Sequence, residues 1–391
     1  MNDERPAQAT NDVELSVVLP CLNEAETVGP CVRLAVETIK RLGIRGEVVV
    51  ADNGSKDASA EIATREGARV VFESRPGYGS ALMRGIEEAR GKYIIMADAD
   101  QSYDLGDLER FVVELRKGYD VVMGSRLRGT IEPGAMPWLH RWIGNPLLSG
   151  LLNFLFHPGI SDAHCGMRAF TKDAYWKMQL QTTGMEFASE MVIKGALAGL
   201  RMAEIPITLH PDQRNRPPHL RSFRDGWRHL RFMLLFSPTY LFLAPGLVCM
   251  TLGLIALLAL LQGPQRLFGL NFDVHYMVIG SLLTLLGFQI IATGFFAKAY
   301  SHAARLYAPD RTLQFLGRHF NLERGLLVGA AVFVIGFAID ATILVDWLRS
   351  GMGELNAVRP ALLGSTLMVL GAEILFSSFF LSMLAIGRRS N

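Results

Sequence analysis

The chain has 391 residues, a length that excludes a single small module and predicts two or three domains with a large buried core. Half of the residues are apolar and only 19% are charged, a composition that places part of the chain in lipid. The net charge of +2 excludes the concentrated basic excess of nucleic-acid-binding proteins, so we expect no nucleic acid partner.

The charges are unevenly distributed along the chain. Residues 1–237 are 25% charged and have a soluble composition, whereas residues 238–391 are 11% charged and have a membrane composition. The polar N-terminus lacks the apolar core of a signal peptide, and the four cysteines form no C-x-x-C pair. We therefore expect a disordered tail over residues 1–13, reduced thiols, and a first domain that stays in the cytoplasm.

Residues 14–221 are predicted to form an α/β domain, because short β-branched runs alternate with helical patterns. The predicted strands cover residues 15–20, 47–52, 68–73, 92–98 and 120–125, and the predicted helices lie near 27–42, 57–67, 79–90 and 104–117. We expect a parallel, Rossmann-like sheet of the nucleotide-binding type. A polar, turn-rich cluster follows each strand, so five loops are predicted to meet at one edge of the sheet and make a site.

Two amphipathic segments are predicted to lie in the membrane surface. The first, at about 136–156, surrounds His140 and Arg141 with apolar and aromatic residues, and the second, at 222–238, places arginines beside Phe223 and Trp227. An ordinary amphipathic helix on the domain is the alternative for each. A membrane segment follows the second directly, which favours the interfacial interpretation.

Four transmembrane spans are predicted within residues 239–391, at about 239–262, 274–297, 325–346 and 360–386. Basic residues concentrate in 208–237, in 298–324 and in the C-terminal tail, so the positive-inside rule predicts that both termini are cytoplasmic. Glu373 falls near the middle of the last span. Its alternatives are a hydrogen bond within or between subunits and a role in a lipid path.

Asp98 and Asp100 stand at the end of the apolar strand KYIIMAD, where alternation points both carboxylates into the loop edge. Two oxygen ligands at this spacing suit Mg²⁺ or Mn²⁺ and leave coordination positions for a diphosphate. Two solvated strand-end acids are the plainer alternative. The sequence therefore predicts a divalent metal as cofactor.

Three other strand ends carry candidate nucleotide contacts. Asp52 closes the second strand, where its carboxylate is placed to accept a hydrogen bond from a ring N–H of uracil or guanine, although turn chemistry also favours Asp-Asn-Gly-Ser. The loop 20–24 is predicted to line the nucleoside. Gly77 and Gly79 would let the backbone approach a phosphate or ribose before a helix N-terminus.

His164 beside Cys165 is interpreted as a packed loop, because no partners for nucleophilic chemistry accompany it.

Together these motifs resemble glycosyltransferase family 2 on a GT-A fold. The residues that carry the resemblance are PCLNEAE (20–26), ADNGSKDAS (51–59), GYGSALMRG (77–85), DAD (98–100), GSR (124–126), DAHCGMRAF (162–170) and GLRMAEIPI (199–207). The added interfacial helices and spans are similar to those of polyprenyl-phosphate glycosyltransferases, such as dolichol-phosphate mannose and glucose synthases and bacterial undecaprenyl-phosphate glycosyltransferases. The motif detail covers about residues 15–237, and the spans match only in kind.

The resemblance implies roles for individual residues. It implies nucleoside contacts from Pro20, Asn23, Glu24, Asp52 and Ser55, and metal and diphosphate binding at Asp98 and Asp100, with Ser102 where related synthases often carry Gln. It also implies that the lipid phosphate is held by Arg126, Arg141 and Asn145, and that the sugar pocket is bordered by Asp162 and Arg168, with Glu190 as a further candidate. Arg126 is counted with the two aspartates as catalytic. The segment Arg214–Pro218 departs from the family pattern.

We therefore expect an inverting transferase that moves a hexose, glucose or mannose, from a UDP- or GDP-sugar to a polyprenyl phosphate at the cytoplasmic face. One alternative is an enzyme that glycosylates a lipid alcohol or a polysaccharide, with Glu186 or Glu190 as base, although no Q-x-x-R-W motif is present. The other is a non-catalytic nucleotide-sugar-binding scaffold or translocator. The expected partners are the nucleotide sugar, the undecaprenyl or dolichyl phosphate and the bilayer; the sugar, the acceptor and a homo-oligomeric state are left open.

Overall fold

The structure is a computed structural model that describes residues 13–213, 222–267, 269–303 and 321–386. The predicted tail lies almost entirely outside these residues, as do the Arg214–Pro218 segment and Arg388 and Arg389. Two compact units divide the chain, residues 1–233 and 234–391. Each unit is described by itself.

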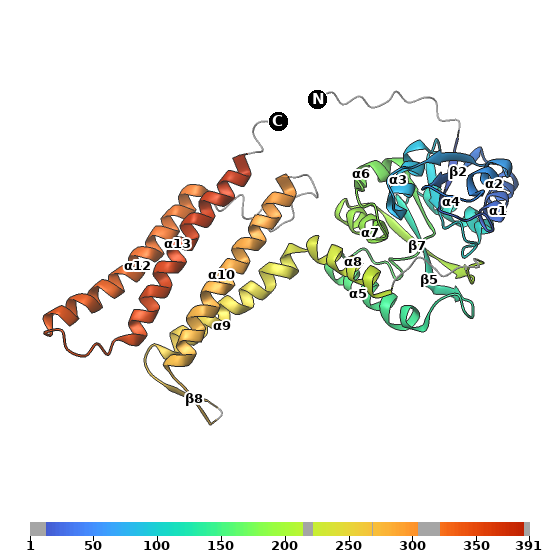
Figure 1. Cartoon of the computed structure of the whole chain (residues 1–391). Coiled ribbons are helices and arrows are strands. Elements are labelled where there is room, and N and C mark those ends of the chain that lie inside the picture. Colours follow the sequence, from blue (N-terminus) through green and yellow to red (C-terminus); the bar gives the residue numbers. More distant parts are fainter. Residues whose placement is uncertain (1–12, 214–221, 268, 304–320, 387–391) are drawn as a thin grey trace. The chain divides into compact units, whose positions relative to one another are not determined.

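A seven-stranded sheet forms the centre of the first unit (Figure 1). Its spatial order is β3-β2-β1-β4-β6-β5-β7. The strands are β1 (Leu15–Cys21), β2 (Gly46–Asp52), β3 (Arg69–Phe72), β4 (Tyr93–Met96), β5 (Val121–Ile131), β6 (Arg168–Thr171) and β7 (Met202–Leu209). The five predicted strands are β1 to β5, and the order that places β1 between β2 and β4 brings their loops together at one edge.

The five predicted strands all point the same way, but the sheet also contains β6, which the sequence did not predict and which runs antiparallel to both β4 and β5. Because β6 is antiparallel to both of its neighbours, β4 and β5 point the same way. β7 pairs parallel to β5. β6 has only four residues and follows a loop, which leaves too little periodicity to identify a strand. The sheet is mixed, and the predicted loops after β1, β2, β3 and β4 lie at one edge.

β5 is longer than predicted and continues through residues that were expected to form a loop. Its pairing with β7 breaks after Ser125 and resumes at Thr130, which pairs with Thr208. A Cβ on Gly129 would lie 1.9 Å from the Ile207 carbonyl oxygen, so only glycine permits this close approach of β7. Arg126 therefore sits inside an irregular strand rather than after its end.

Helices cover both faces of the sheet. They are α1 (Val28–Arg41), α2 (Ser59–Arg65), α3 (Tyr78–Glu88), α4 (Leu108–Arg116), α6 (Lys172–Met178) and α7 (Phe187–Leu197), with a 3₁₀ turn, η1 (Leu105–Asp107), before α4. α1 buries Val28, Val32 and Ala35 against β1, because apolar residues recur at helical spacing. α3 packs on the opposite face, where a Cβ on Gly85 would meet Val18 at 2.6 Å.

The two amphipathic segments are helical in the structure. A π-helical turn, η2 (His140–Gly144), runs into α5 (Asn145–Phe156), and α8 (Ser222–Leu235) contains most of the second segment. The large apolar side chains Trp138, Trp142, Leu147 and Phe154 of the first segment are exposed, and so are Phe223 and Trp227 of α8. This exposure suits contact with a membrane surface.

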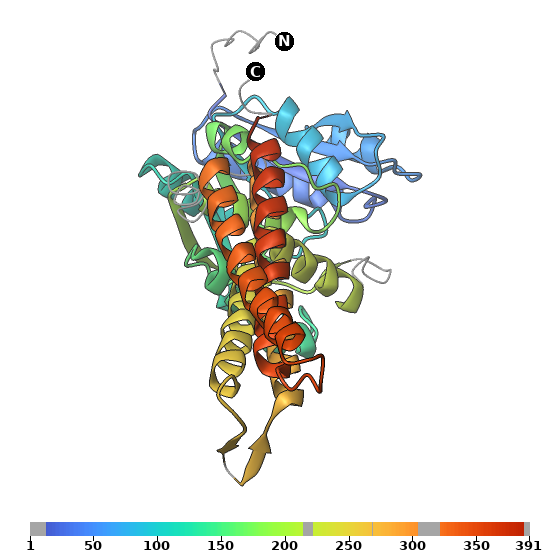
Figure 2. The same cartoon turned by 90° about the vertical axis from the view of Figure 1, so that its left-hand side faces the viewer.

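Among its described residues, the second unit contains four helices long and apolar enough to cross a membrane, at Thr239–Leu260, Val274–His302, Leu322–Arg349 and Val358–Leu384. They comprise a π-helical turn, η3 (Thr239–Leu243), with α9 (Ala244–Leu260), then α10 (Val274–Ala303), α12 (Leu322–Arg349) and α13 (Val358–Ile386). Both views show α12 and α13 side by side along most of their length (Figures 1 and 2). A short hairpin of β8 (Gln265–Leu267) and β9 (Leu270–Phe272) connects α9 to α10.

Glycines pack the helices of this unit in pairs. Gly253 of α9 and Gly280 of α10 face one another, as do Gly336 of α12 and Gly364 of α13. Polar contacts then join α10 to α13, including the 2.7 Å hydrogen bond between Ser281 and Thr366. Gln289 of α10 lies within hydrogen-bond reach of Glu373, so this acid has a partner inside the unit.

Candidate active site

The loops after β1 and β2 are fastened to one another by side-chain hydrogen bonds. Asn23, in the left-handed conformation with φ 56°, donates its main-chain N–H to Ser55 Oγ at 2.9 Å and accepts from Lys56 N at 2.7 Å. The Glu24 main-chain N–H donates to Ser59 Oγ at 2.8 Å. These contacts shape the loops that the resemblance assigns to the nucleoside, and Pro20 lies beside them in β1, paired with Ala51.

Asp52 presents an unused acceptor at this edge. Its side chain is 3% exposed, and Oδ2 accepts from the main-chain N–H groups of Gly54 and Ser55, each at 3.1 Å. Oδ1 is buried and has no hydrogen-bond partner among the residues that the structure describes. Because a buried acceptor without a partner is costly, this oxygen fits a ligand N–H such as the ring N–H of uracil or guanine.

Changing Asp52 to asparagine should weaken nucleoside diphosphate binding by about 10- to 100-fold. The asparagine carbonyl can keep the turn contacts to Gly54 and Ser55, which turns the amide N–H₂ toward the ligand, where a donor would meet a donor. Isothermal titration calorimetry with UDP and GDP measures the effect. An affinity equal to that of the unchanged chain for both nucleotides would remove Asp52 from the nucleotide site.

Asp98 and Asp100 follow β4 at the same edge. Tyr78 donates its hydroxyl to Asp98 Oδ1 at 2.9 Å, and Ser102 donates both its main-chain N–H and its hydroxyl to Asp100 Oδ1, at 3.0 and 2.6 Å. Both carboxylates are thereby oriented by donors from their own edge of the sheet. In this arrangement the Ser102 hydroxyl donates its proton to Asp100 and so orients the Asp100 carboxylate.

The residues around this pair fit a divalent cation of the Mg²⁺ type, because all the ligand atoms they offer to a metal are oxygens. Within the described part of the chain, no group of three His, Cys, Asp or Glu side chains gathers at a metal-binding distance. Asp98 and Asp100 would therefore supply only part of a coordination shell, and the remaining positions would fall to water and to diphosphate oxygens.

Gly77 and Gly79 make room for a protein loop. A Cβ on Gly77 would lie 2.1 Å from the Thr183 carbonyl oxygen, and one on Gly79 would lie 2.2 Å from that of Thr182. Residues 182–184 therefore occupy the space where a Cβ on either glycine would lie, and the predicted approach of a phosphate or ribose stays a prediction. Ser80 N donates to the Thr183 carbonyl at 3.2 Å and joins this loop to the start of α3.

Glu190 anchors the same loop from α7. Its carboxylate accepts from the main-chain N–H groups of Gln181 and Thr182 and from the Thr182 hydroxyl, and it pairs with Lys194 at 2.7 Å. The side chain is 1% exposed and has no spare oxygen. The structure therefore gives Glu190 a supporting part instead of a place as a base beside a carbohydrate acceptor.

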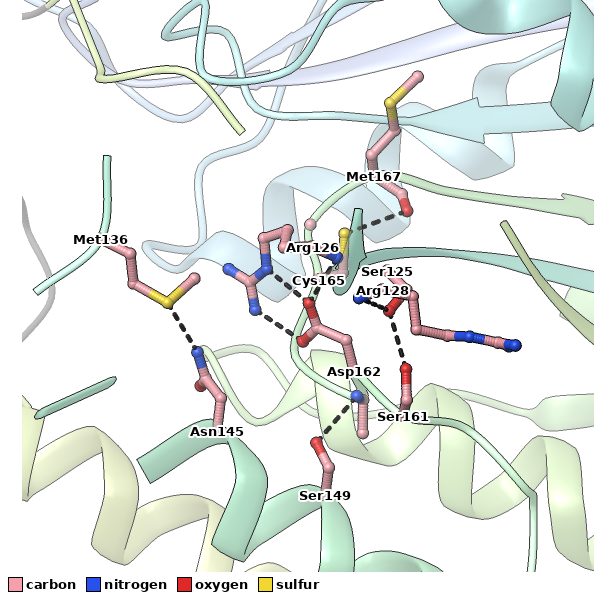
Figure 3. Close-up of polar contacts among 12 residues, drawn as sticks. Ser125, Arg126, Arg128, Met136, Asn145, Ser149, Ser161, Asp162, Cys165 and Met167 are labelled. Carbon is pink, nitrogen blue, oxygen red and sulfur yellow. Dashed lines mark hydrogen bonds and ion pairs between the residues drawn. The ribbon is translucent and has the colours of Figure 1, made fainter. Parts of the chain in front are cut away.

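Arg126 of β5 forms a buried ion pair with Asp162 (Figure 3). Nε and Nη2 of Arg126 donate to the two carboxylate oxygens of Asp162 at 2.7 and 2.8 Å, and the Arg126 main-chain N–H adds a third bond at 3.0 Å. Asp162 is fully buried and the Arg126 side chain is 11% exposed. The remaining nitrogen, Nη1, makes no hydrogen bond with any described residue and is the one left for an anionic ligand.

The two other candidate phosphate contacts lie on the amphipathic segment. Asn145 donates to Met136 Sδ at 3.4 Å, and Figure 3 shows both on the same side of Asp162 as the Arg126 guanidinium. Arg141 lies over the ring of Trp142, with 5.2 Å between its Cζ and the ring centroid. Burial lowers the pKa of His140, and the positive charge of Arg126 lowers it further.

Arg168 is fully buried and binds only the backbone. Its guanidinium donates to the carbonyl oxygens of Cys165, Ala188 and Ala163 at 2.7, 2.6 and 3.1 Å. These bonds brace the loop 162–168 against α7. Because all three bonds go to main-chain carbonyl oxygens, the place of Arg168 at the sugar pocket stays a prediction.

A pair of buried histidines joins α8 to the same loop. The Ser189 hydroxyl lies 3.2 Å from His164 Nε2 and 2.7 Å from His229 Nδ1, and the two rings meet edge to face at 4.6 Å. Burial lowers the pKa of both rings, that of His229 to about 4. Cys165 is inert, because burial raises the pKa of its thiol to about 12.

The stability of the first unit should fall as the pH drops. Since the folded His229 binds its proton with a pKa near 4 and an unfolded histidine near 6.5, protonation favours the unfolded chain, by up to about 3 kcal/mol between pH 6.5 and 4. Melting temperatures of the full chain at pH 7 and pH 5 measure the effect. His229→Gln should flatten this dependence and the exposed control His157→Asn should not; equal slopes in all three chains would exclude the histidine pair as the cause.

Comparisons with known proteins identify the family. Residues 16–179 match the model of glycosyl transferase family 2, and residues 295–385 match that of the glycosyltransferase family 2 C-terminal transmembrane region. The chain is 41% identical over 385 residues to the low-salt glycan biosynthesis hexosyltransferase of Haloferax volcanii, covering 98% of this chain and 92% of that protein. The chain belongs to glycosyltransferase family 2.

Other relatives of this glycosyltransferase match about half of the chain. The dolichyl-phosphate hexose transferase of Haloferax volcanii is 33% identical over 196 residues, covering 50% of this chain and 82% of that protein. Among solved structures, the glucosyl-3-phosphoglycerate synthase of Mycobacterium tuberculosis in complex with Mn²⁺ and UDP is 23% identical, with a TM-score of 0.44 over 57% of this chain and 78% of that one.

The family match confirms the predicted resemblance and the GT-A class, and the matched transmembrane region together with the four apolar helices supports an integral membrane protein. Three residues that position the site of this glycosyltransferase were not predicted from the sequence. Tyr78 orients Asp98, Asn53 accepts from Gly77 N at 2.7 Å, and Glu204 holds the loop that carries Asp162. All three lie inside motifs quoted for the resemblance, but no role was predicted for them.

Proposed function

We propose that this glycosyltransferase moves a hexose from a nucleoside diphosphate sugar to a polyprenyl phosphate at the cytoplasmic face of the membrane, with inversion at the anomeric carbon. One observation carries the proposal, namely that the loop 162–168 touches both halves of the site. Asp162 holds Arg126, and four residues later a Cβ on Gly166 would lie 2.6 Å from Asp98 Oδ2. A donor diphosphate at Asp98 and an acceptor anion at Arg126 would therefore be neighbours.

The proposed reaction requires that the acceptor phosphate be positioned and that the charge on the departing diphosphate be neutralised. A lipid monophosphate has a second pKa near 6, so one of its oxygens is already anionic at neutral pH and needs no general base. That oxygen would attack the anomeric carbon as the bond from this carbon to the diphosphate oxygen breaks, and the nucleoside diphosphate would leave from the opposite face. A divalent cation held by Asp98 and Asp100 would offset the charge that develops on the departing diphosphate.

The chain's own residues would divide the remaining work. The free Oδ1 of Asp52 would fix the base, and Arg126 Nη1 would receive the acceptor phosphate. Arg141 and the exposed Trp142 would lie at the membrane surface, where the polyprenyl chain must enter. The arginines before the first span and the bases after the second support a cytoplasmic location of the site and of both termini.

Glu190 does not suit the part of the base in the polysaccharide alternative, which leaves Glu186, whose Oε2 is buried without a hydrogen-bond partner among the described residues, as the candidate for that part. A base for a sugar hydroxyl needs an oxygen free to take a proton, and the carboxylate of Glu190 is engaged by two main-chain N–H groups, a hydroxyl and Lys194. The acceptor phosphate that we propose needs no such base.

An acceptor panel with the full chain in detergent or nanodiscs tests the proposal. Radiolabelled UDP-glucose and GDP-mannose are each offered undecaprenyl phosphate, dolichyl phosphate, the matching alcohols and diacylglycerol. We expect labelled lipid only with the phosphates. Transfer to an alcohol or diacylglycerol would overturn the acceptor class, and no lipid product from any common nucleotide sugar would support a binding scaffold instead.

A further inference from the structure

Glu204 lies in the middle of β7, where its Cα pairs with that of Met123 in β5. Its side chain is 4% exposed, although the strand is at the edge of the sheet. An acid this deeply buried requires partners that offset its desolvation. Those partners all belong to the loop that carries Asp162 or to β5.

One oxygen of Glu204 gathers three donors from two consecutive residues. Oε1 accepts from the Ser161 main-chain N–H at 2.9 Å, from the Ser161 hydroxyl at 2.9 Å, and from the Asp162 main-chain N–H at 3.0 Å. The Ser161 hydroxyl also lies 2.8 Å from Ser125 Oγ, next to Arg126 in β5 (Figure 3). Glu204 therefore fixes the backbone from which the Asp162 carboxylate projects.

The second oxygen of Glu204 has a different partner. Oε2 lies 3.3 Å from Nη1 of Arg128, whose side chain is 61% exposed. An ion pair with so exposed a partner is screened by water and contributes little. Figure 3 shows the Arg128 side chain extending away from Asp162, whereas the Arg126 guanidinium faces it. Glu204 therefore binds the loop that carries Asp162 through Oε1 and contacts the surface residue Arg128 through Oε2.

The contacts form a series that ends at the acceptor site. Glu204 holds the Asp162 backbone, the Asp162 carboxylate holds Nε and Nη2 of Arg126, and Nη1 of Arg126 is left for an anion. Helix α5 grips the same loop on either side, through Asn153 with Ile160 and Ser149 with Ala163. Of the three side chains that hold this loop, Glu204, Asn153 and Ser149, Glu204 is the charged one and the one that accepts from the main-chain N–H of Asp162 itself.

We propose that Glu204 is a positioning residue for the acceptor, which sets the direction of Arg126 through Asp162 without touching the substrate. This inference rests on the proposed function, because it takes Arg126 to bind the lipid phosphate. Glu204→Ala should raise the KM for polyprenyl phosphate by about 10- to 100-fold, the effect of misplacing a binding group by about 1 Å. Glu204→Gln keeps a carbonyl oxygen for the three donors and should restore most of this loss.

The test is a double-mutant cycle on the full chain, with the KM for the acceptor and the Kd for the nucleotide measured separately. If Glu204 acts through Arg126, Glu204→Ala raises the acceptor KM in the unchanged chain and adds nothing in the Arg126→Ala background. The nucleotide Kd should not change. Arg128→Ala is the matched control, because it removes only the surface partner of Glu204.

Additive effects on the acceptor KM, or an equal loss of nucleotide affinity, would overturn the inference by showing a general structural role. An effect of Arg128→Ala as large as that of Glu204→Ala would also overturn it. If Glu204→Ala does not fold, Glu204→Gln and Ser161→Ala carry the same cycle with smaller shifts. An Arg126→Ala chain with an unchanged acceptor KM would instead contradict the proposed function, so the two failures are distinguishable.

Discussion

Replacing Asp100 with alanine should reduce the kcat/KM of glycosyl transfer by at least about 1,000-fold, because it removes one of the two carboxylates that fit a divalent cation. Asp100 is 7% exposed and is held by Ser102, and no group of three His, Cys, Asp or Glu side chains gathers among the described residues, so the variant would leave Asp98 as the remaining carboxylate of the pair. The initial rate of lipid labelling measures the loss. The affinity for the nucleoside diphosphate should at the same time lose its dependence on Mg²⁺, which binding assays with and without the metal measure.

Asp107 provides the control for this prediction. It is a partly exposed acid seven residues further on and pairs with the exposed Arg110, so Asp107→Ala should leave both rate and metal dependence unchanged. Asp100→Asn keeps the size of the side chain and should behave like Asp100→Ala if charge is what matters. Full activity of either Asp100 variant would contradict the metal assignment.

Changing Asp162 to asparagine should destabilise the protein by about 3–5 kcal/mol, because the buried Arg126 cation would lose its counter-charge. Asp162 has no exposed surface, and its carboxylate takes three hydrogen bonds from Arg126. A decrease of roughly 10 °C in the melting temperature of the full chain is the expected reading. The KM for the acceptor phosphate should also rise, since Arg126 would no longer be held in one direction.

Two further chains make this prediction specific. Glu66→Gln removes an acid from an exposed two-bond pair with Arg33 and should leave the melting temperature unchanged. The double variant Arg126→Met with Asp162→Asn should be more stable than Asp162→Asn alone, because it leaves no uncompensated charge. A double variant less stable than the single one would show that the pair contributes by packing instead of by charge compensation.

The parts of the fold that repeat along the chain were predictable from the sequence. β1, β2 and α1 have strong periodicity, and the four apolar helices are long enough to be recognised by length alone. β6 could not be predicted, because four residues between a loop and a helix carry no pattern of their own and depend on pairing with β4. The extension of β5 to Ile131 depends in the same way on β7.

The residues of the candidate site likewise differ in how far the sequence alone predicts their place. Asp52, Asp98 and Asp100 were predictable because each stands where a strand ends, and strand ends meet at one edge of the sheet. The pairing of Arg126 with Asp162 joins residues 36 positions apart, and the grip of Glu204 on Asp162 spans 42 positions. Contacts of this range depend on how β6 and β7 are placed, which local patterns do not specify.

The linkage in the product tests the account most directly. The full chain is incubated with a polyprenyl phosphate and the donor sugar it accepts, and the purified lipid is analysed by ³¹P nuclear magnetic resonance and mass spectrometry. The account predicts a phosphodiester in which the anomeric carbon is bonded to the acceptor phosphate oxygen, with the configuration opposite to that of the donor. A sugar on a lipid hydroxyl, or a product with the donor's configuration, would contradict it.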